Sequence, residues 1–179
     1  MTLVLQEPPY IKQNKLANCW YACLRMLFAA HGDQPVVTSQ NVKNMQSGFK
    51  GNYATRRYVD INHVDGTYLS TKGYIAEDLS GAAGTHIEQP LSNANDIENF
   101  LRRHGPFVGG GEIFKPLPGV RIAAGHAILI YGVENNRILH HDPWSGRAVT
   151  IGINKYIARQ DHEVIWKRTN PTVSILRQS

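Results

Sequence analysis

Cys19 is the residue of this sequence whose type and setting best suit nucleophilic chemistry. It opens the apolar run CWYACLRMLF, and Gln13 lies six residues upstream. A helix N-terminus favours negative charge, so a cysteine placed there is stabilised as the thiolate, the form that attacks a carbonyl carbon. The side-chain amide of Gln13 can donate a hydrogen bond to the oxyanion that such an attack creates. A nucleophilic Cys19 would also need a base and a group that orients this base.

His126 is the best candidate for the base. Gly125-His126 opens the apolar segment HAILIYGV, and an imidazole at the start of a buried strand can face a cleft while the core fixes the strand. Asp142 ends the next expected strand, after a turn at Glu134–Asn136. The resulting hairpin would place the two strand ends side by side. Asp142 could then accept a hydrogen bond from one imidazole nitrogen of His126 while the other nitrogen faces Cys19.

A helix over residues 19–31 is expected to carry Cys19. Asn18 is a suitable N-cap for this helix, and Gly32 is a suitable stop. Helical spacing places one apolar stripe on the residues Trp20, Cys23, Leu24, Leu27, Phe28 and His31. In this register Cys19 lies at the exposed mouth of the helix. Cys23 lies within the buried stripe, where thiols are usually unreactive.

The rest of the chain predicts helices in the first half and an antiparallel sheet in the second, an α+β arrangement. A second helix is expected over residues 96–103, capped from Asn93 or Asn95 and closed by Gly105-Pro106. Short helices are also expected at Thr38–Met45 and Tyr74–Leu79. Further strands are expected at Phe107-Val108, Arg137–Asp142, Ala148–Ile153, His162–Trp166 and Thr172–Leu176.

The size and composition of the chain indicate one globular domain over residues 1–179. Its hydrophobic content of 42% and charged content of 18% are ordinary globular values. No apolar run approaches the roughly 20 residues of a membrane span, so we expect no membrane partner. The N-terminal MTLVLQE also lacks the basic start and long apolar stretch of a secretory signal.

The net charge of +5 permits attraction to acidic partners. However, the basic pairs are isolated along the chain, at Arg56-Arg57, Arg102-Arg103 and Lys167-Arg168. No nucleic-acid motif accompanies them, and we expect no nucleic-acid partner. The run Gly109–Gly111 lacks the Lys and Ser/Thr of a phosphate loop, and is expected to allow a bend or a close backbone approach.

The two cysteines, Cys19 and Cys23, are expected to be free thiols, because a disulfide within one helical turn would be strained. His140 and His141 stand next to Asp142 and suggest metal ligands. The sequence has no second cluster that would complete a zinc site. We therefore expect no metal, and nothing in the sequence predicts another cofactor.

The chain resembles papain-like cysteine peptidases at four places in order: Gln13, Cys19-Trp20, Gly125-His126 and Asp142-Pro143-Trp144. In that family a Gln six residues before the Cys helps to form the oxyanion hole, and the Cys begins the central helix. A His and an Asn or Asp follow on the sheet, often with a Trp two residues later that screens them. The resemblance implies a papain-like α+β fold, in which an N-terminal central helix carrying Cys19 packs on a C-terminal antiparallel sheet carrying His126 and Asp142.

Within this family, the segments CWYACLRMLFAAHG, HAILIYGV and DPWSG are most similar to two bacterial branches. One contains the leader-peptide-cleaving domains of bacteriocin exporters, and the other contains papain-like effector peptidases that bacteria inject into host cells. The leader peptidases usually have Gly directly after the nucleophile, so Trp20 is closer to the effector pattern. The resemblance implies a bacterial effector or toxin, located in the cytoplasm of the producer or exported by a specialised secretion system into a target cell.

These residues together predict a papain-like thiol hydrolase that cleaves a peptide bond through a thioester. The predicted roles are nucleophile for Cys19, general base and acid for His126, orienting carboxylate for Asp142 and oxyanion donor for Gln13. Trp20, Trp144 and Gly125 are predicted to border a protein or peptide substrate. An inhibitor or immunity protein is a further partner that the resemblance allows.

The same triad also serves glutamine deamidases and amidases that cut cell-wall peptides. A degenerate domain of this kind could instead bind peptides without cutting them. The resemblance covers residues 13–32 and 95–150 but not residues 33–92, where we expect the determinants of specificity to lie.

Overall fold

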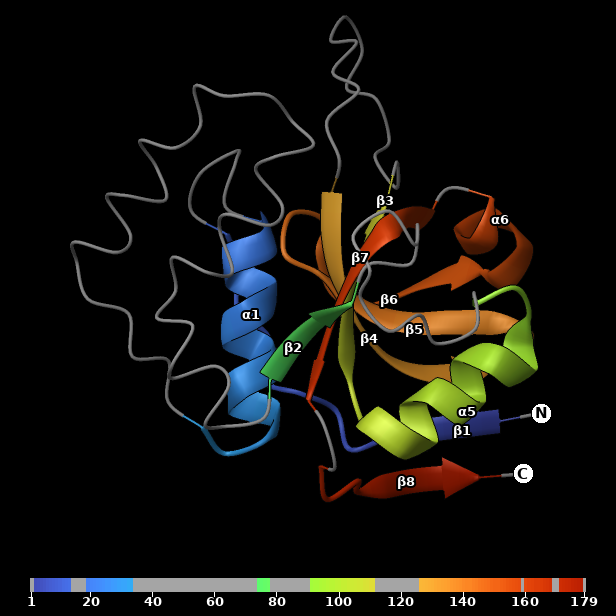
Figure 1. Ribbon diagram of the computed structural model, residues 1–179, viewed down its shortest axis with the longest axis horizontal. Coiled ribbons are helices and arrows are strands. Elements are labelled where there is room, and N and C mark those ends of the chain that lie inside the picture. The colour runs from blue at the N-terminus through green and yellow to red at the C-terminus, as the bar shows by residue number, and fades with distance from the viewer. Residues whose placement is uncertain are drawn as a thin grey trace, which may run out of the picture.

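Strand β4 (His126–Glu134) is the centre of the sheet around which the described part of the chain is arranged (Figure 1). The computed structural model describes residues 2–13, 19–33, 74–77, 91–111, 126–158, 160–168 and 171–178. β4 pairs with β3 (Phe107–Gly111) through its first half and with β1 (Thr2–Leu5) through its second half. Strand β5 (Arg137–Asp142) lines its other edge. All of these pairs are antiparallel.

The other described strands extend the sheet on both sides of β4, to give eight strands in all. β7 (Gln160–Arg168) pairs with β3, and β2 (Tyr74–Glu77) pairs with β7. β6 (Gly146–Gly152) pairs with β5. β8 (Ile175–Gln178) pairs with β1, so the first and last strands lie side by side at one edge (Figure 1).

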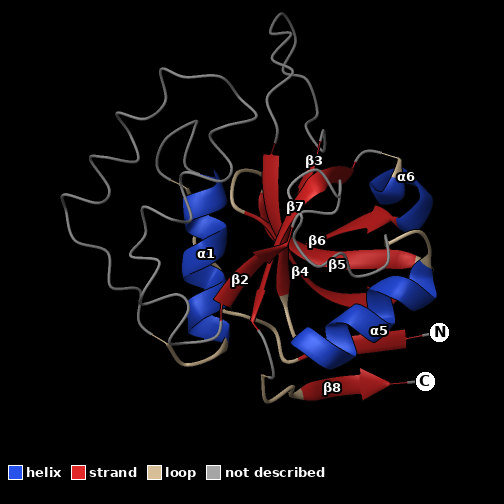
Figure 2. Ribbon diagram, in the orientation of Figure 1, coloured by secondary structure: helices blue, strands red, loops and turns tan. Residues whose placement is uncertain are grey.

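Helix α1 (Cys19–Ala30) packs against one face of the sheet, over β4 and β3 (Figure 2). Its described side chains between residues 22 and 28 are buried except for Arg25. Their cluster with the sheet contains Cys19, Cys23, Leu24, Met26, Leu27, Phe28, Val108, Ala127 and Leu129. The predicted stripe is thus confirmed at Cys23, Leu24, Leu27 and Phe28, and Met26 adds to it. His31 is only half-buried, and the side chain of Trp20 lies outside the described part of the chain.

The end of α1 agrees with the predicted stop. Gly32 has φ +71°, the left-handed region that glycine adopts without strain. The N–H of Gly32 donates to the carbonyl of Ala29 at 3.1 Å, and the N–H of Asp33 donates to that of Phe28 at 2.9 Å. This pair of bonds is a Schellman cap, which satisfies the last carbonyls of the helix.

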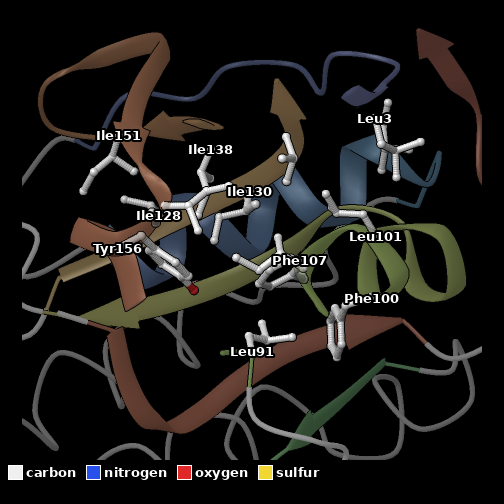
Figure 3. Close-up of a cluster of buried hydrophobic side chains, with 14 residues drawn as sticks. Leu3, Leu91, Phe100, Leu101, Phe107, Ile128, Ile130, Ile138, Ile151 and Tyr156 are labelled. Carbon is white, nitrogen blue, oxygen red and sulfur yellow. The ribbon is translucent and has the colours of Figure 1, made fainter. Parts of the chain in front are cut away.

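The second core lies on the opposite face, because alternate residues of β4 belong to different clusters: Ile128 and Ile130 face this core, whereas Leu129 faces α1. Helices α5 (Ala94–His104) and α6 (Ile153–Ile157) cover it. Figure 3 shows Phe100, Phe107, Tyr156 and their neighbours in this cluster. The rings of Phe100 and Phe107 meet edge to face, with their centroids 4.8 Å apart.

Gly109 lets α6 approach the sheet closely. A Cβ atom at this position would lie 2.7 Å from the hydroxyl oxygen of Tyr156. Real Cβ atoms do not come so close to another heavy atom, so the backbone of β3 must carry glycine here for Tyr156 to pack as it does. The glycine run was expected to allow a close approach near the cleft; at Gly109 a close approach is present, but its partner is Tyr156 of the core cluster.

Several predicted elements are confirmed with small shifts of their ends. The helix predicted over residues 96–103 is α5, with Asn93 as its N-cap: the Asn93 side chain accepts from the N–H of Asp96 at 3.0 Å. The predicted turn between β4 and β5 contains Asn135 and Asn136, with φ +50° and +59°, as in a type I′ hairpin turn.

One predicted element is wrong, two observed elements were not predicted, and one prediction falls on residues that the structure does not describe. Tyr74–Leu79 was expected to be helical, but residues 74–77 form strand β2, because pairing with β7 supplies hydrogen bonds that local propensity does not anticipate. Strand β1 and helix α6 were not predicted. The predicted helix at Thr38–Met45 lies outside the described residues.

The α+β class is confirmed by an antiparallel sheet with a few helices packed on it. No helix among the described residues is long and apolar enough to cross a membrane.

Candidate active site

Cys19 is the first residue of α1, where the free N–H groups of the helix favour a negative charge. Cys19 was expected to be exposed at the start of the helix, but its exposed fraction is only 8%. The reason is its packing in the cluster that α1 forms with Ala127 and Leu129 of β4. His126, the first residue of β4, lies beside Cys19, and its interaction with the Cys19 side chain helps to raise the pKa of the imidazole.

His126 and Asp142 also meet. The Nε2 atom of His126 lies 2.7 Å from Oδ1 of Asp142, and both side chains are buried. Since Nε2 is engaged by the carboxylate, Nδ1 is the nitrogen left to face Cys19. The structure thus brings the predicted site residues Cys19, His126 and Asp142 together.

A bulge in the hairpin puts Asp142 on the same face as His126. The pairs Val133 with Ile138 and Gly132 with Leu139 follow one register, and Ile130 with His140 and Leu129 with His141 follow another, shifted by one residue. Continued by one step, the second register would set Asp142 opposite Ile128. Ile128 is two residues from His126 and shares its face. Without the shift at Tyr131, Asp142 would oppose Leu129 and point to the other face.

Four hydrogen bonds hold the Asp142 carboxylate. Oδ1 accepts from His126 and from the backbone N–H groups of Trp144, at 2.8 Å, and Ser145, at 3.1 Å. Oδ2 accepts from the Ser145 hydroxyl at 2.5 Å. Burial alone would raise the pKa of Asp142, but the His126 imidazole and these donors outweigh burial, and the pKa lies well below its usual range. Asp142 is thus a fixed anion at neutral pH.

The same environment favours the charged form of His126. Burial opposes the imidazolium, but the hydrogen bonds and charges of Asp142 and Cys19 outweigh it and raise the pKa of His126 to about 9. An imidazolium beside Cys19 stabilises the thiolate form of the cysteine. The arrangement therefore places a positive charge beside the Cys19 side chain at neutral pH.

Gln13 lies close to this group through its backbone. Its N–H donates to the carbonyl of Pro143 at 3.0 Å, directly after Asp142, and its side chain is buried. Trp144, predicted to border the substrate, is 39% exposed and donates its backbone N–H to Asp142. Gly125, Asn18 and the side chain of Trp20 lie outside the described part of the structure.

Comparison with known proteins places this chain in a family. Residues 4–161 match the family model described as papain-like cysteine protease AvrRpt2. The chain belongs to this family. It is therefore a papain-like cysteine peptidase, as its resemblance predicted, and it acts on a protein or peptide substrate.

A solved structure supports the fold of this peptidase. The chain is similar to the peptidase domain of Streptococcus ComA, which is described as a bi-functional ABC transporter involved in a quorum-sensing pathway. The TM-score is 0.56, with 13% identity over 90% of this chain and 99% of that domain. At this identity the likeness concerns the fold alone. No curated protein matches the sequence.

The second cysteine of this peptidase differs from the first. Cys23 is fully buried one turn further along α1, and both cysteines are free thiols. Burial, followed by the nearby charges of Cys19 and Asp142, raises the pKa of Cys23 well above its ordinary value. Cys23 is therefore a neutral thiol, in agreement with its predicted lack of reactivity.

Sequence reasoning missed the residues that hold Asp142 and its neighbours. Ser145 follows Asp142 by three residues, a spacing at which Asp and Ser commonly form side-chain to backbone hydrogen bonds, and this signal could have identified it. His141 was considered only as a metal ligand. Its Nε2 atom donates instead to the carbonyl of Pro8 at 2.8 Å, and Nδ1 accepts from the N–H of Ala148 at 3.1 Å. In the described ranges, no three His, Cys, Asp or Glu residues are grouped to hold a metal ion.

Proposed function

We propose that this peptidase cleaves its substrate with Cys19 as nucleophile, His126 as general base and acid, and Asp142 as the carboxylate that orients the imidazole. The observation that carries the proposal is the 2.7 Å hydrogen bond from His126 Nε2 to Asp142, which leaves Nδ1 to serve Cys19 at the helix N-terminus. Gln13 is the proposed side-chain donor of the oxyanion hole, together with the backbone N–H of Cys19.

Each step of this mechanism has a group to carry it. The Cys19 thiolate attacks the scissile carbonyl carbon, and the oxyanion is stabilised by the Gln13 amide. His126 gives its proton to the leaving amine, which departs and leaves a thioester on Cys19. Neutral His126 then takes a proton from water, and the resulting attack releases the new carboxyl group and restores the thiolate with its imidazolium. Asp142 remains charged throughout and holds the ring in place.

We infer further that the peptidase acts as a bacterial effector or toxin on a protein of another cell. The support for this step is the resemblance of CWYACLRMLFAAHG and HAILIYGV to injected papain-like effector peptidases. An inhibitor or immunity protein in the producing cell would be consistent with such a role.

The decisive experiment compares wild type with Cys19→Ala in extracts of candidate target cells. New protein N-termini should appear only with the wild-type enzyme, and circular dichroism should show that the variant keeps its fold. Equal cleavage by Cys19→Ala would refute the mechanism. If Cys19-dependent modification occurs without new termini, and intact mass shows conversion of an amide to an acid, the reaction is glutamine deamidation. Release of fragments from purified sacculi would instead identify a cell-wall amidase.

A further inference from the structure

The segment that leads to Gln13 is joined to the hairpin of β5 and β6 by four contacts in succession. Moving along the segment, Glu7 pairs with Arg147 at 2.6 Å and the Pro8 carbonyl accepts from His141 at 2.8 Å. The Tyr10 hydroxyl then donates to the carbonyl of Asp142 at 3.3 Å, and the Gln13 N–H donates to that of Pro143 at 3.0 Å. We call these four contacts the clasp. It links two stretches more than 100 residues apart, each of which carries a proposed catalytic group.

His141 is the buried centre of the clasp, with no exposed surface. Because Nε2 donates to Pro8 and Nδ1 accepts from Ala148, the ring must be neutral and in a single tautomer. The rings of Tyr10 and Tyr131 pack against it, at centroid distances of 5.5 and 4.9 Å.

The contact with Ala148 fixes an unusual backbone. Ala148 has φ +51°, a conformation that residues with a side chain rarely adopt, and the hydrogen bond from its N–H to His141 helps to hold it there. Ala148 follows Arg147, the outermost residue of the clasp. His141 therefore connects the segment before Gln13 with both strands that flank the turn after Asp142.

We propose that His141 is a positioning residue that keeps Gln13 and Asp142 in a fixed mutual arrangement. Its side chain points to the face opposite that of Asp142, so it does not reach the reacting atoms. It acts through the backbone on both sides of the site. The oxyanion donor and the orienting carboxylate then keep their places as a unit. This inference rests on the proposed function of Cys19, His126, Asp142 and Gln13.

The required chemistry is one donor and one acceptor in the same side chain. Protonated His141 would lose its acceptor and present Nδ1–H to the N–H of Ala148. Burial lowers the pKa of His141 and so protects the neutral form. Two charged groups lie beside His141: Glu7, whose Oε1 is 3.8 Å from Nε2, raises its pKa, and Arg147 lowers it. Tyr10 and Tyr131 are the other titratable groups whose rings contact it.

Two probes separate the effects on the thiolate from those on the oxyanion hole. Iodoacetamide alkylates Cys19 by a displacement that forms no oxyanion, so its rate reports the thiolate that His126 and Asp142 maintain. p-Nitrophenyl acetate acylates Cys19 through an oxyanion, so its rate also reports the Gln13 donor. Both probes are small and need no knowledge of the natural substrate.

The variants are His141→Leu, which removes both hydrogen bonds, and His141→Gln, which can keep one donor and one acceptor. We expect acylation to fall at least about tenfold in His141→Leu, with a smaller fall in alkylation, and to recover substantially in His141→Gln. In the double variant Gln13→Ala with His141→Leu, the loss of acylation should be clearly less than the product of the two single losses, because both act on one donor. Ile138→Val, in the same strand but outside the clasp, is the control for a loss of packing.

If folded His141→Leu acylates as fast as Ile138→Val, or if the losses with Gln13→Ala simply multiply, His141 is not a positioning residue. If His141→Gln is no better than His141→Leu, the requirement for a donor and an acceptor is refuted as well. Failure of the proposed function is a separate result, because it would appear as unchanged acylation in Cys19→Ala.

Discussion

His126 and Asp142 lie within 2.7 Å of each other because a one-residue bulge at Tyr131 shifts the register of the hairpin that connects them. Without this shift, the alternation of side chains along β5 would be reversed relative to β4 at the end of the hairpin that carries Asp142. The bulge is thus what turns two adjacent strand ends into an interacting pair. Beta bulges are often found beside functional sites, where they redirect a side chain.

The two cysteines should differ sharply in their reactivity towards iodoacetamide. Cys19 lies at the helix N-terminus beside a His126 whose pKa is raised to about 9, whereas burial keeps Cys23 neutral. At neutral pH we expect Cys19 to be alkylated faster than a model thiol, and Cys23 to be alkylated only after unfolding. Peptide mapping by mass spectrometry before and after addition of denaturant measures both rates. Equal labelling of the two residues in the folded protein would contradict this assignment.

Substitution of Asp142 should reduce the rate and move the alkaline limit of activity. Asp142→Ala removes the partner of His126, and we expect acylation by p-nitrophenyl acetate to fall by about 10²–10⁴-fold. Asp142→Asn should lose less, because its amide oxygen can still accept from Nε2.

The pH dependence separates these two variants from a general loss of structure. In the wild type, the imidazolium that stabilises the thiolate is lost as the pH rises through about 9. Both variants lack the negative charge that raises the pKa of His126, so the midpoint of this decline should shift to lower pH. An unchanged midpoint in the rate profile of Asp142→Asn would show that Asp142 does not control the ionisation of His126.

The sequence predicted the parts of the site that have a local pattern. α1 has helical periodicity and a Gly stop, and the β4–β5 hairpin has an apolar strand followed by two turn-forming asparagines. These signals suffice to bring Cys19, His126 and Asp142 into the same region. They do so because each signal is contained within a few residues of chain.

The features that the sequence did not predict depend on pairing between distant segments. Strand β1 is four residues long and buried without alternation, so only its partners β4 and β8 define it as a strand. Residues 74–77 became β2 for a similar reason. The hydrogen bond from His141 to Pro8 spans 133 residues and leaves no pattern in either segment. Such contacts have no local periodicity and become visible only in three dimensions.

The buried histidines His126 and His140 should together make thermal stability greatest near pH 6.5. The pKa of His126 is raised from 6.5 to about 9, so its contribution is complete below pH 6.5 and is lost as the pH rises through 9. Burial lowers the pKa of His140 to about 4, so its contribution is complete above pH 6.5 and is lost as the pH falls towards 4. The unfolding temperature should therefore decline on both sides.

Single variants assign the two declines. In His126→Gln the alkaline decline of the unfolding temperature should become smaller, and in His140→Leu the acid decline should become smaller. Differential scanning fluorimetry across the range from pH 4 to pH 9, at constant ionic strength, measures both. If either variant keeps the pH dependence of the wild type, the corresponding histidine does not cause that decline.

The approach of Tyr156 to Gly109 should make this glycine intolerant of even one methyl group. Gly109→Ala would place Cβ 2.7 Å from the Tyr156 hydroxyl and 3.2 Å from Ile130, and we expect it to lower the free energy of unfolding by about 1–3 kcal/mol. Tyr156→Phe removes the nearer atom, so the double variant should be more stable than the sum of the single losses predicts. Gly152→Ala is the matched control, because nothing lies within 4 Å of its Cβ position. Urea unfolding of the four variants and the wild type measures the coupling; strictly additive losses would mean that Tyr156 does not set the requirement for glycine.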